Sequence, residues 1–78
     1  MSYNAIGGQG AKTLAGSLPG TLTELGLVGC SIRDKGGEAI LEWAKFADGL
    51  LMICIEDNNM SDQMHEQFGG LKGMSVFV

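Results

Sequence analysis

Residues 22–32 read LTELGLVGCSI, and this stretch decides the fold. Its apolar residues follow the spacing L-x-x-L-x-L-x-x-C-x-I. Side chains two residues apart in a strand point to the same face, so the spacing predicts a short strand with one buried side, followed by a turn. Residues 50–60, LLMICIEDNNM, repeat the same offsets, with Asn58 in the place of Cys30. A strand-and-turn unit therefore begins at Leu22 and recurs from Leu50.

Parts of the same unit occur towards both ends of the chain. Leu71, Met74 and Val76 match its first apolar positions, whereas Asn4 and Ile6 match only its tail. The 78 residues are therefore expected to form one repeat segment. Its expected parts are a partial repeat at 1–21, a repeat at 22–49, a shorter repeat at 50–70 and a partial repeat at 71–78.

Stacking the strands in parallel, with equivalent residues side by side, predicts two buried rows. The first row contains Leu25, Ile53 and Met74, and the second contains Leu27, Ile55 and Val76. Cys30 and Asn58 then lie in the turn after each strand. There an Asn side chain can bond to backbone groups that the departing chain leaves unpaired, and a Cys fits as a compact buried group.

Parallel strands require long connections, and these favour helices. The clearest predicted helix covers roughly residues 34–47, with Asp34 or Ser31 as its N-cap and Gly49 in a left-handed conformation at its end. Its apolar stripe consists of Ala39, Ile40, Trp43, Ala44 and Ala47. Weaker helices are expected over roughly residues 8–17 and 62–68.

These residues resemble the leucine-rich repeat family. The repeat length, measured from Asn4 to Cys30 and from Cys30 to Asn58, is similar to that of its ribonuclease-inhibitor-like subclass. The helical half agrees, because Gly10, Leu14, Ala15 and Leu18 recur as Gly36, Ile40, Leu41 and Ala44. The resemblance implies an α/β solenoid of two to three short parallel strands with helices on the convex side. It also implies a non-catalytic interaction or scaffolding element within a larger protein or complex. The alternative is a ligand-sensing or substrate-recognition part of a receptor, ligase or effector.

Composition narrows the possible partners. The net charge of −4 and a pI near 4.6 argue against binding to a nucleic-acid backbone. The longest apolar run, residues 50–55, is far shorter than the roughly 20 residues that span a bilayer, so direct membrane insertion is not expected. Two cysteines are too few for a disulfide-dense secreted scaffold. We expect an intracellular, reducing compartment, with the cytoplasm and organelles both open.

No stretch predicts catalysis, a cofactor or a metal. Residues 7–13 look like a phosphate-binding loop, but Ala11 interrupts the required Gly-Lys pair. His65 is the only histidine and has no credible nucleophile on its predicted surface. Residues 56–62 do not have the spacing of a calcium loop.

The remaining candidate site is the exposed face of the sheet, which is the concave face in the family. Its predicted partner-binding residues are Glu24, Val28, Met52, Cys54, Glu56, Ser75 and Phe77. The ends of the solenoid are the alternative site. There Val76, Phe77 and Val78 form an apolar edge that could pair with another chain, so protein partners are expected, including neighbouring subunits that cap the repeat ends.

Overall fold

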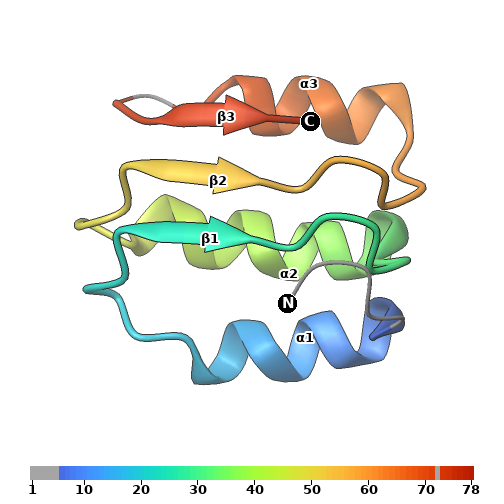
Figure 1. Ribbon diagram of the computed structural model, residues 1–78, viewed down its shortest axis with the longest axis horizontal. Helices are drawn as coiled ribbons and strands as arrows, with labels where there is room; N and C mark the ends of the chain where they lie inside the picture. Colours follow the sequence, from blue (N-terminus) through green and yellow to red (C-terminus); the bar gives the residue numbers. More distant parts are fainter. Residues whose placement is uncertain (1–5, 72) are drawn as a thin grey trace.

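A computed structural model describes residues 6–71 and 73–78, so the predicted role of Asn4 lies outside the described residues. Within these described ranges, three helices alternate with three strands. In chain order they are α1 (Gly7–Ser17), β1 (Glu24–Gly26), α2 (Arg33–Phe46), β2 (Met52–Cys54), α3 (Asp62–Gly69) and β3 (Ser75–Phe77). The strands form a parallel sheet in the order β1-β2-β3, and the helices form a second layer on one side of it (Figure 1). The expected α/β repeat fold is therefore confirmed.

The register confirms one expected pair and corrects another. Leu25 lies opposite Ile53, as predicted. Val76 lies opposite Ile53, however, so Met74 is not in the first row and Val76 is not in the second row opposite Ile55. The prediction was wrong by two residues because Gly73, with φ +78°, bends the chain before β3 begins. Met74 is an apolar residue that packs against the core from this bend. A slip of two residues keeps the alternation of faces, so Ser75 and Phe77 still point outward.

The core lies between the sheet and the helices. The inward side chains of β1 and β2 and of the turns that follow them are buried, among them Leu27, Ile53 and Ile55. Phe68 of α3 and Ile40 of α2 cover these residues, and both side chains are 0% exposed. β1 and β2 thus each bury one face against helices, as the period of two required, and Val76 of β3 is partly buried against the same core.

The turns after β1 and β2 have the same backbone geometry. Gly29 and Asp57 occupy equivalent positions of the two repeats, and both have positive φ, at 67° and 58°. Ser31 and Asn59 are equivalent in the same way and have φ of 55° and 57°. Two left-handed residues at matching positions turn the chain from strand to helix in the same way each time.

Asn58 holds these two turns together from inside the core. Its side-chain Oδ1 accepts from the N–H of Cys30 at 2.8 Å and from that of Ile32 at 3.4 Å. Its Nδ2 donates to the carbonyls of Ile55 at 2.8 Å and Glu56 at 3.1 Å, and also to that of Leu27. The predicted turn role of Asn58 is confirmed, and Cys30 is fully buried beside it.

Two details of α2 differ from the prediction. No side chain caps its start, so neither Asp34 nor Ser31 is its N-cap. The Asp34 carboxylate instead reaches the next repeat, where it accepts from Ser61 N–H and Ser61 Oγ, each at 2.8 Å. Gly49 is not left-handed, and the helix ends at Ala47 without it. A side chain at Gly49 would meet the carbonyl oxygen of Thr21 at 3.2 Å, so this glycine serves close packing of two loops.

Candidate functional site

The outward face of the sheet is a short grid of side chains. Glu24, Met52 and Ser75 form one row across the three strands, and Gly26, Cys54 and Phe77 form the next. Phe77 is 49% exposed, and both Met52 and Cys54 are partly exposed. Val28 and Glu56 follow in the turns. All the residues predicted for this site therefore reach the surface, either in one of these two neighbouring rows or in the turns directly after them.

A gap in these rows of side chains, here called the notch, lies at Gly26 on β1, at one edge of the sheet. Gly26 has no side chain, and a Cβ added there would meet nothing within 4 Å. Cys54 stands beside it on β2, and Glu24 and Val28 lie two residues away on either side along the chain. Neighbouring side chains on one face of a sheet lie about 5 Å apart, so a missing one leaves room for a group from outside.

The charge of the face is acidic. Glu24 and Glu56 are exposed, and none of the outward positions carries a basic side chain. The Cys54 thiol donates to Oε1 of Glu56 at 3.6 Å, which holds that carboxylate over the end of β2. Cys54 and Cys30 are not joined in a disulfide.

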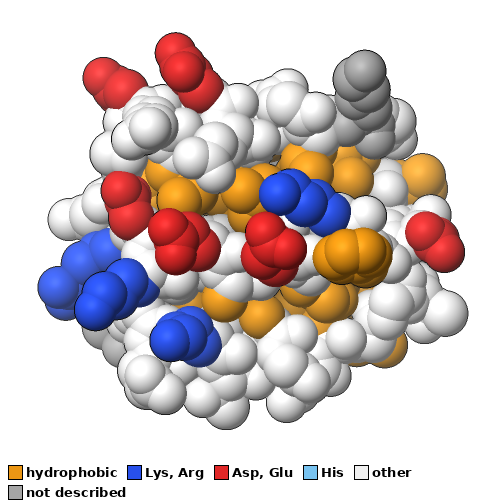
Figure 2. All heavy atoms as spheres, turned by 180° about the vertical axis from the view of Figure 1, so that it is seen from behind, with side chains coloured by type: hydrophobic (Ala, Val, Ile, Leu, Met, Phe, Trp, Pro, Cys, Tyr) orange, Lys and Arg blue, Asp and Glu red, His pale blue; other side chains and the backbone are white. Residues whose placement is uncertain are grey.

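The opposite, helical face has a different character. Figure 2 shows charged side chains gathered over the middle of this face, with hydrophobic seams on either side. Glu38, Glu42 and Lys45 are exposed positions of α2, and Lys45 Nζ lies 3.3 Å from Oε1 of Glu42. Such an exposed i, i+3 pair contributes little to stability, so this face is mainly a solvated surface.

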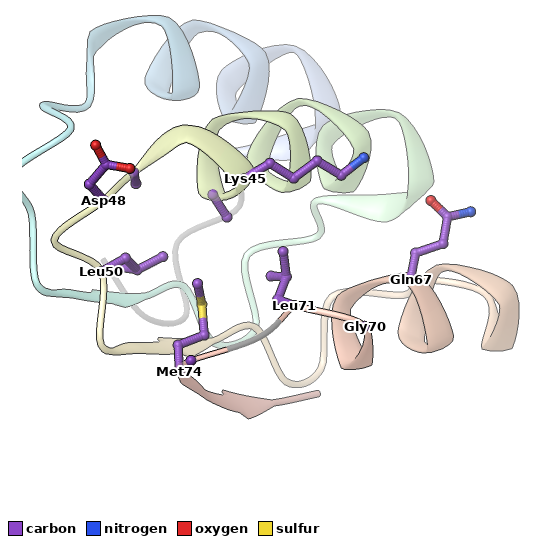
Figure 3. Close-up of a pocket in the computed structure, with 10 residues that line it drawn as sticks. Lys45, Asp48, Leu50, Gln67, Gly70, Leu71 and Met74 are labelled. Atoms are coloured by element: carbon purple, nitrogen blue, oxygen red, sulfur yellow. The ribbon is translucent and has the colours of Figure 1, made fainter.

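A cleft of about 550 Å³ opens between α2 and the chain that leads from α3 to β3. Leu50, Leu71 and Met74 gather at its floor, while Lys45 and Gln67 stand on the helices that flank it (Figure 3). It exists because α3 has 8 residues and α2 has 14, so the second half of α2 is not covered by a helix on that side. Sequence reasoning missed this cleft, although the short distance from Leu50 to Leu71 was its signal.

The one pKa shift on the described surface belongs to Asp34. The N–H and the hydroxyl of Ser61 donate to its carboxylate, and His65 adds a smaller electrostatic effect, so the pKa of Asp34 lies below its ordinary value of 3.8. Ser61 Oγ in turn accepts from Met64 N–H at 3.2 Å and caps α3. His65 therefore lies near a structural contact between repeats.

The other sequence features have structural roles. Residues 7–13 are part of α1 itself and form no phosphate loop. The side-chain oxygen and nitrogen of Asn58 are both used inside the core, so residues 56–62 do not offer it to a cation. Among residues 6–71 and 73–78, no three His, Cys, Asp or Glu side chains form a group that could hold a metal ion. Within the same ranges, no helix is long and apolar enough to cross a membrane.

Comparison with known families gives one match. The family model described as Leucine Rich repeat matches residues 1–15 and 21–41. The match supports assignment of the chain to a leucine-rich repeat family. The helices and the parallel three-stranded sheet of the described residues fit an α/β repeat fold. Proteins of this family generally bind other proteins and are generally non-catalytic. No curated protein and no solved structure matches the chain.

Proposed function

We propose that this chain is a protein-binding module that holds its partner against the outward face of the sheet. The observation that carries the proposal is the notch at Gly26, which lies beside the partly exposed Cys54 and between the positions of the carboxylates Glu24 and Glu56 along the strands. An apolar side chain of the partner would fill the notch beside Cys54, with Met52 diagonally across on β2 and Phe77 one strand further away on β3. Buried apolar anchors supply most of the binding energy of such contacts.

The charge of the face specifies the partner further. Glu24 and Glu56 lie on opposite sides of the notch along the strands, and the whole chain has a net charge of −4. A partner with Lys or Arg on both sides of its apolar anchor would be attracted and oriented by them. The fitting ligand is therefore an extended basic segment with one central apolar residue.

The finer features of the proposal follow from the repeat. Residues at equivalent repeat positions pair across β1 and β2, such as Leu25 with Ile53, and the repeat length that this implies supports assignment to the ribonuclease-inhibitor-like subclass. A role as a scaffolding element in a larger complex, with neighbouring subunits at the repeat ends, is consistent with two surfaces for contact, the sheet face and the β3 edge. The two separate cysteines support a reducing compartment as its place of action.

The test is selection of binders from a random peptide library displayed on phage, followed by affinity measurement with the selected peptides. We expect peptides with an apolar residue flanked by Lys or Arg. Gly26→Trp should weaken their binding at least tenfold, because it fills the notch, and Glu56→Lys should weaken it by reversing the charge. Gly26 and Glu56 are both exposed, so both variants should keep the fold.

Matched variants on the helical side are the controls. Gly16 of α1 also has nothing within 4 Å of an added Cβ, so Gly16→Trp adds the same bulk elsewhere. Glu38→Lys makes the same charge change on α2. The proposal is wrong if the selected peptides lack basic residues, or if Gly16→Trp and Gly26→Trp weaken binding equally.

A further inference from the structure

β3 is an edge strand with one side of its backbone unused by β2. Ser75 N–H donates to the Leu51 carbonyl at 2.9 Å, and the Phe77 carbonyl accepts from Ile55 N–H at 2.9 Å. In a parallel ladder, alternate residues turn both backbone groups to the same neighbour. Val76 lies between the two bonded residues, so its N–H and C=O point away from β2, in the plane of the sheet.

Within the described residues 73–78, this edge has none of the usual protections against pairing. Residues 73–78 read GMSVFV and contain no charge and no proline. Phe77 and Val78 are 49% and 40% exposed. Edge strands of natural proteins are normally blunted by lysines, prolines or inward-pointing charges, and an apolar edge without them is a template for another strand.

We propose that a second copy of this chain pairs with β3 in an antiparallel arrangement centred on Val76. In an antiparallel ladder, a hydrogen-bonded pair of residues exchanges both backbone bonds. Val76 presents one donor and one acceptor, so Val76 of a second copy is its complement on a twofold axis. The two three-stranded sheets then become one continuous sheet.

The side chains that meet across this axis are compatible. With Val76 opposite Val76, Ser75 of each copy lies opposite Phe77 of the other on the outward face. No like charges face each other along the strand, and part of the exposed ring of Phe77 is covered. A twofold contact also closes on itself, whereas a head-to-tail contact between β3 and β1 would continue into a filament.

The pairing does not rest on the proposed function, because the Val76 backbone groups lie in the sheet plane and not on its outward face. The exposed carboxylates of α3, Asp62 and Glu66, lie on the helix nearest to this edge. In a dimer, the carboxylates of the two copies would repel each other. Because charges more than about 8 Å apart are largely screened at physiological ionic strength, dimerisation should be measured at that salt concentration.

The experiment is sedimentation equilibrium of the 78-residue chain over a range of concentrations, with two variants at one position. We expect a reversible dimer with a dissociation constant on the order of 1–100 µM, given the short strand. Val76→Pro removes the outward N–H but no bond to β2, and should weaken the dimer at least tenfold. Val76→Thr keeps the N–H and a branched side chain, and should dimerise as the parent does.

Hydrogen exchange gives a second readout at single residues. The Val76 amide should exchange more slowly as protein concentration rises, whereas the Phe77 amide, which faces β2, should not change. If Val76→Pro fails to fold, Val78→Lys replaces it, since Val78 is exposed and a charge there opposes pairing. A parent chain that stays monomeric, or a dimer that survives in folded Val76→Pro or in Val78→Lys, overturns the proposal and leaves the edge to a different partner.

Discussion

The seam between α1 and α2 and the seam between α2 and α3 join the same kinds of element with different residues. In the first, the backbones approach closely: a Cβ added at Gly36 would lie 2.8 Å from Ala11 Cβ and 3.1 Å from Gly8 Cα. In the second, flexible side chains fill the space: a Cβ added at Gly37 would lie 2.7 Å from Met60 Sδ and 3.3 Å from Met64 Cγ. Adjacent glycines of one helix thus face a rigid neighbour and a yielding one.

The difference shows how a short solenoid can accept an irregular repeat. Small residues fix the distance between α1 and α2, whereas methionines adapt to whatever lies beside them. The adaptable seam is also where α3 is short and the cleft opens. The chain therefore places its rigid contact between full-length helices and its deformable contact next to the shortened unit.

The largest loss of stability is expected on substitution of Asn58. Its side chain joins the turns that lead into α2 and α3, the helices that meet in the second seam. Asn58→Ala leaves the N–H groups of Cys30 and Ile32 without their acceptor, inside the core. Buried unpaired backbone groups cost about 1–3 kcal/mol each, so we expect a loss of about 4 kcal/mol in the free energy of unfolding. Urea unfolding followed by circular dichroism measures this.

Thr13→Ala is the control for that loss, because it also removes one side-chain bond, from Thr13 Oγ1 to the Gln9 carbonyl at 3.1 Å, but on the surface. It should change stability by less than about 0.5 kcal/mol. Equal losses in the two variants would show that Asn58 does not hold the turns together.

The next largest effect is expected in the rigid seam. In Gly36→Ala the new Cβ would lie 2.5 Å from Ile32 Cγ2 and would press on α1 at Ala11. Because the helices must separate, we expect a loss of about 3 kcal/mol by urea unfolding. Ala11→Gly removes one of the clashing atoms, so the double variant should be more stable than the sum of the two single changes predicts. Strict additivity would contradict the close contact.

A smaller effect is expected in the adaptable seam. In Gly37→Ala the Met60 and Met64 side chains can rotate away, and alanine gains up to about 1 kcal/mol of helix propensity over glycine. The net change should stay below about 1 kcal/mol in the same urea experiment. A loss as large as that of Gly36→Ala would mean that the two seams do not differ in rigidity.

Much of this architecture could be predicted from local patterns. Leu25 and Leu27, like Ile53 and Ile55, alternate with polar or small residues, and alternation alone decides which side of a strand is buried. For the same reason the outward residues were predicted on the correct face, and a two-residue error in β3 did not change it. Asn58 was identifiable because the repeat spacing placed it in a turn.

Features that depend on a distant neighbour could not be predicted. Asp34 has the sequence signature of a cap for its own helix, but the structure brings Ser61 of the next repeat to its carboxylate. Gly36 was recognisable in sequence as the repeat equivalent of Gly10, but nothing local shows which backbone approaches it. The notch at Gly26 and the cleft at Leu50 are spaces, and a space is defined by what surrounds it in three dimensions.

The smallest effect concerns the hydrogen bonds that support the adaptable seam and should appear as pH dependence. The folded pKa of Asp34 lies below 3.8, so the folded state favours the charged carboxylate. Its contribution is therefore complete above the unfolded pKa and is lost as pH falls through the lower folded value. Urea unfolding of the parent and of Asp34→Asn between about pH 2 and pH 6 measures this contribution.

The two stability curves should differ most at the upper end of this pH range and converge at the acidic end, because the parent then also lacks the charge. Ser61→Ala serves as the partner variant: it removes the hydroxyl donor but keeps the N–H donor, so it should reduce the difference without abolishing it. Curves that stay parallel down to the lowest pH would show that the Asp34 charge does not stabilise the contact between α2 and α3. The seam would then depend on its methionines alone, and Gly37→Ala would disturb it at every pH alike.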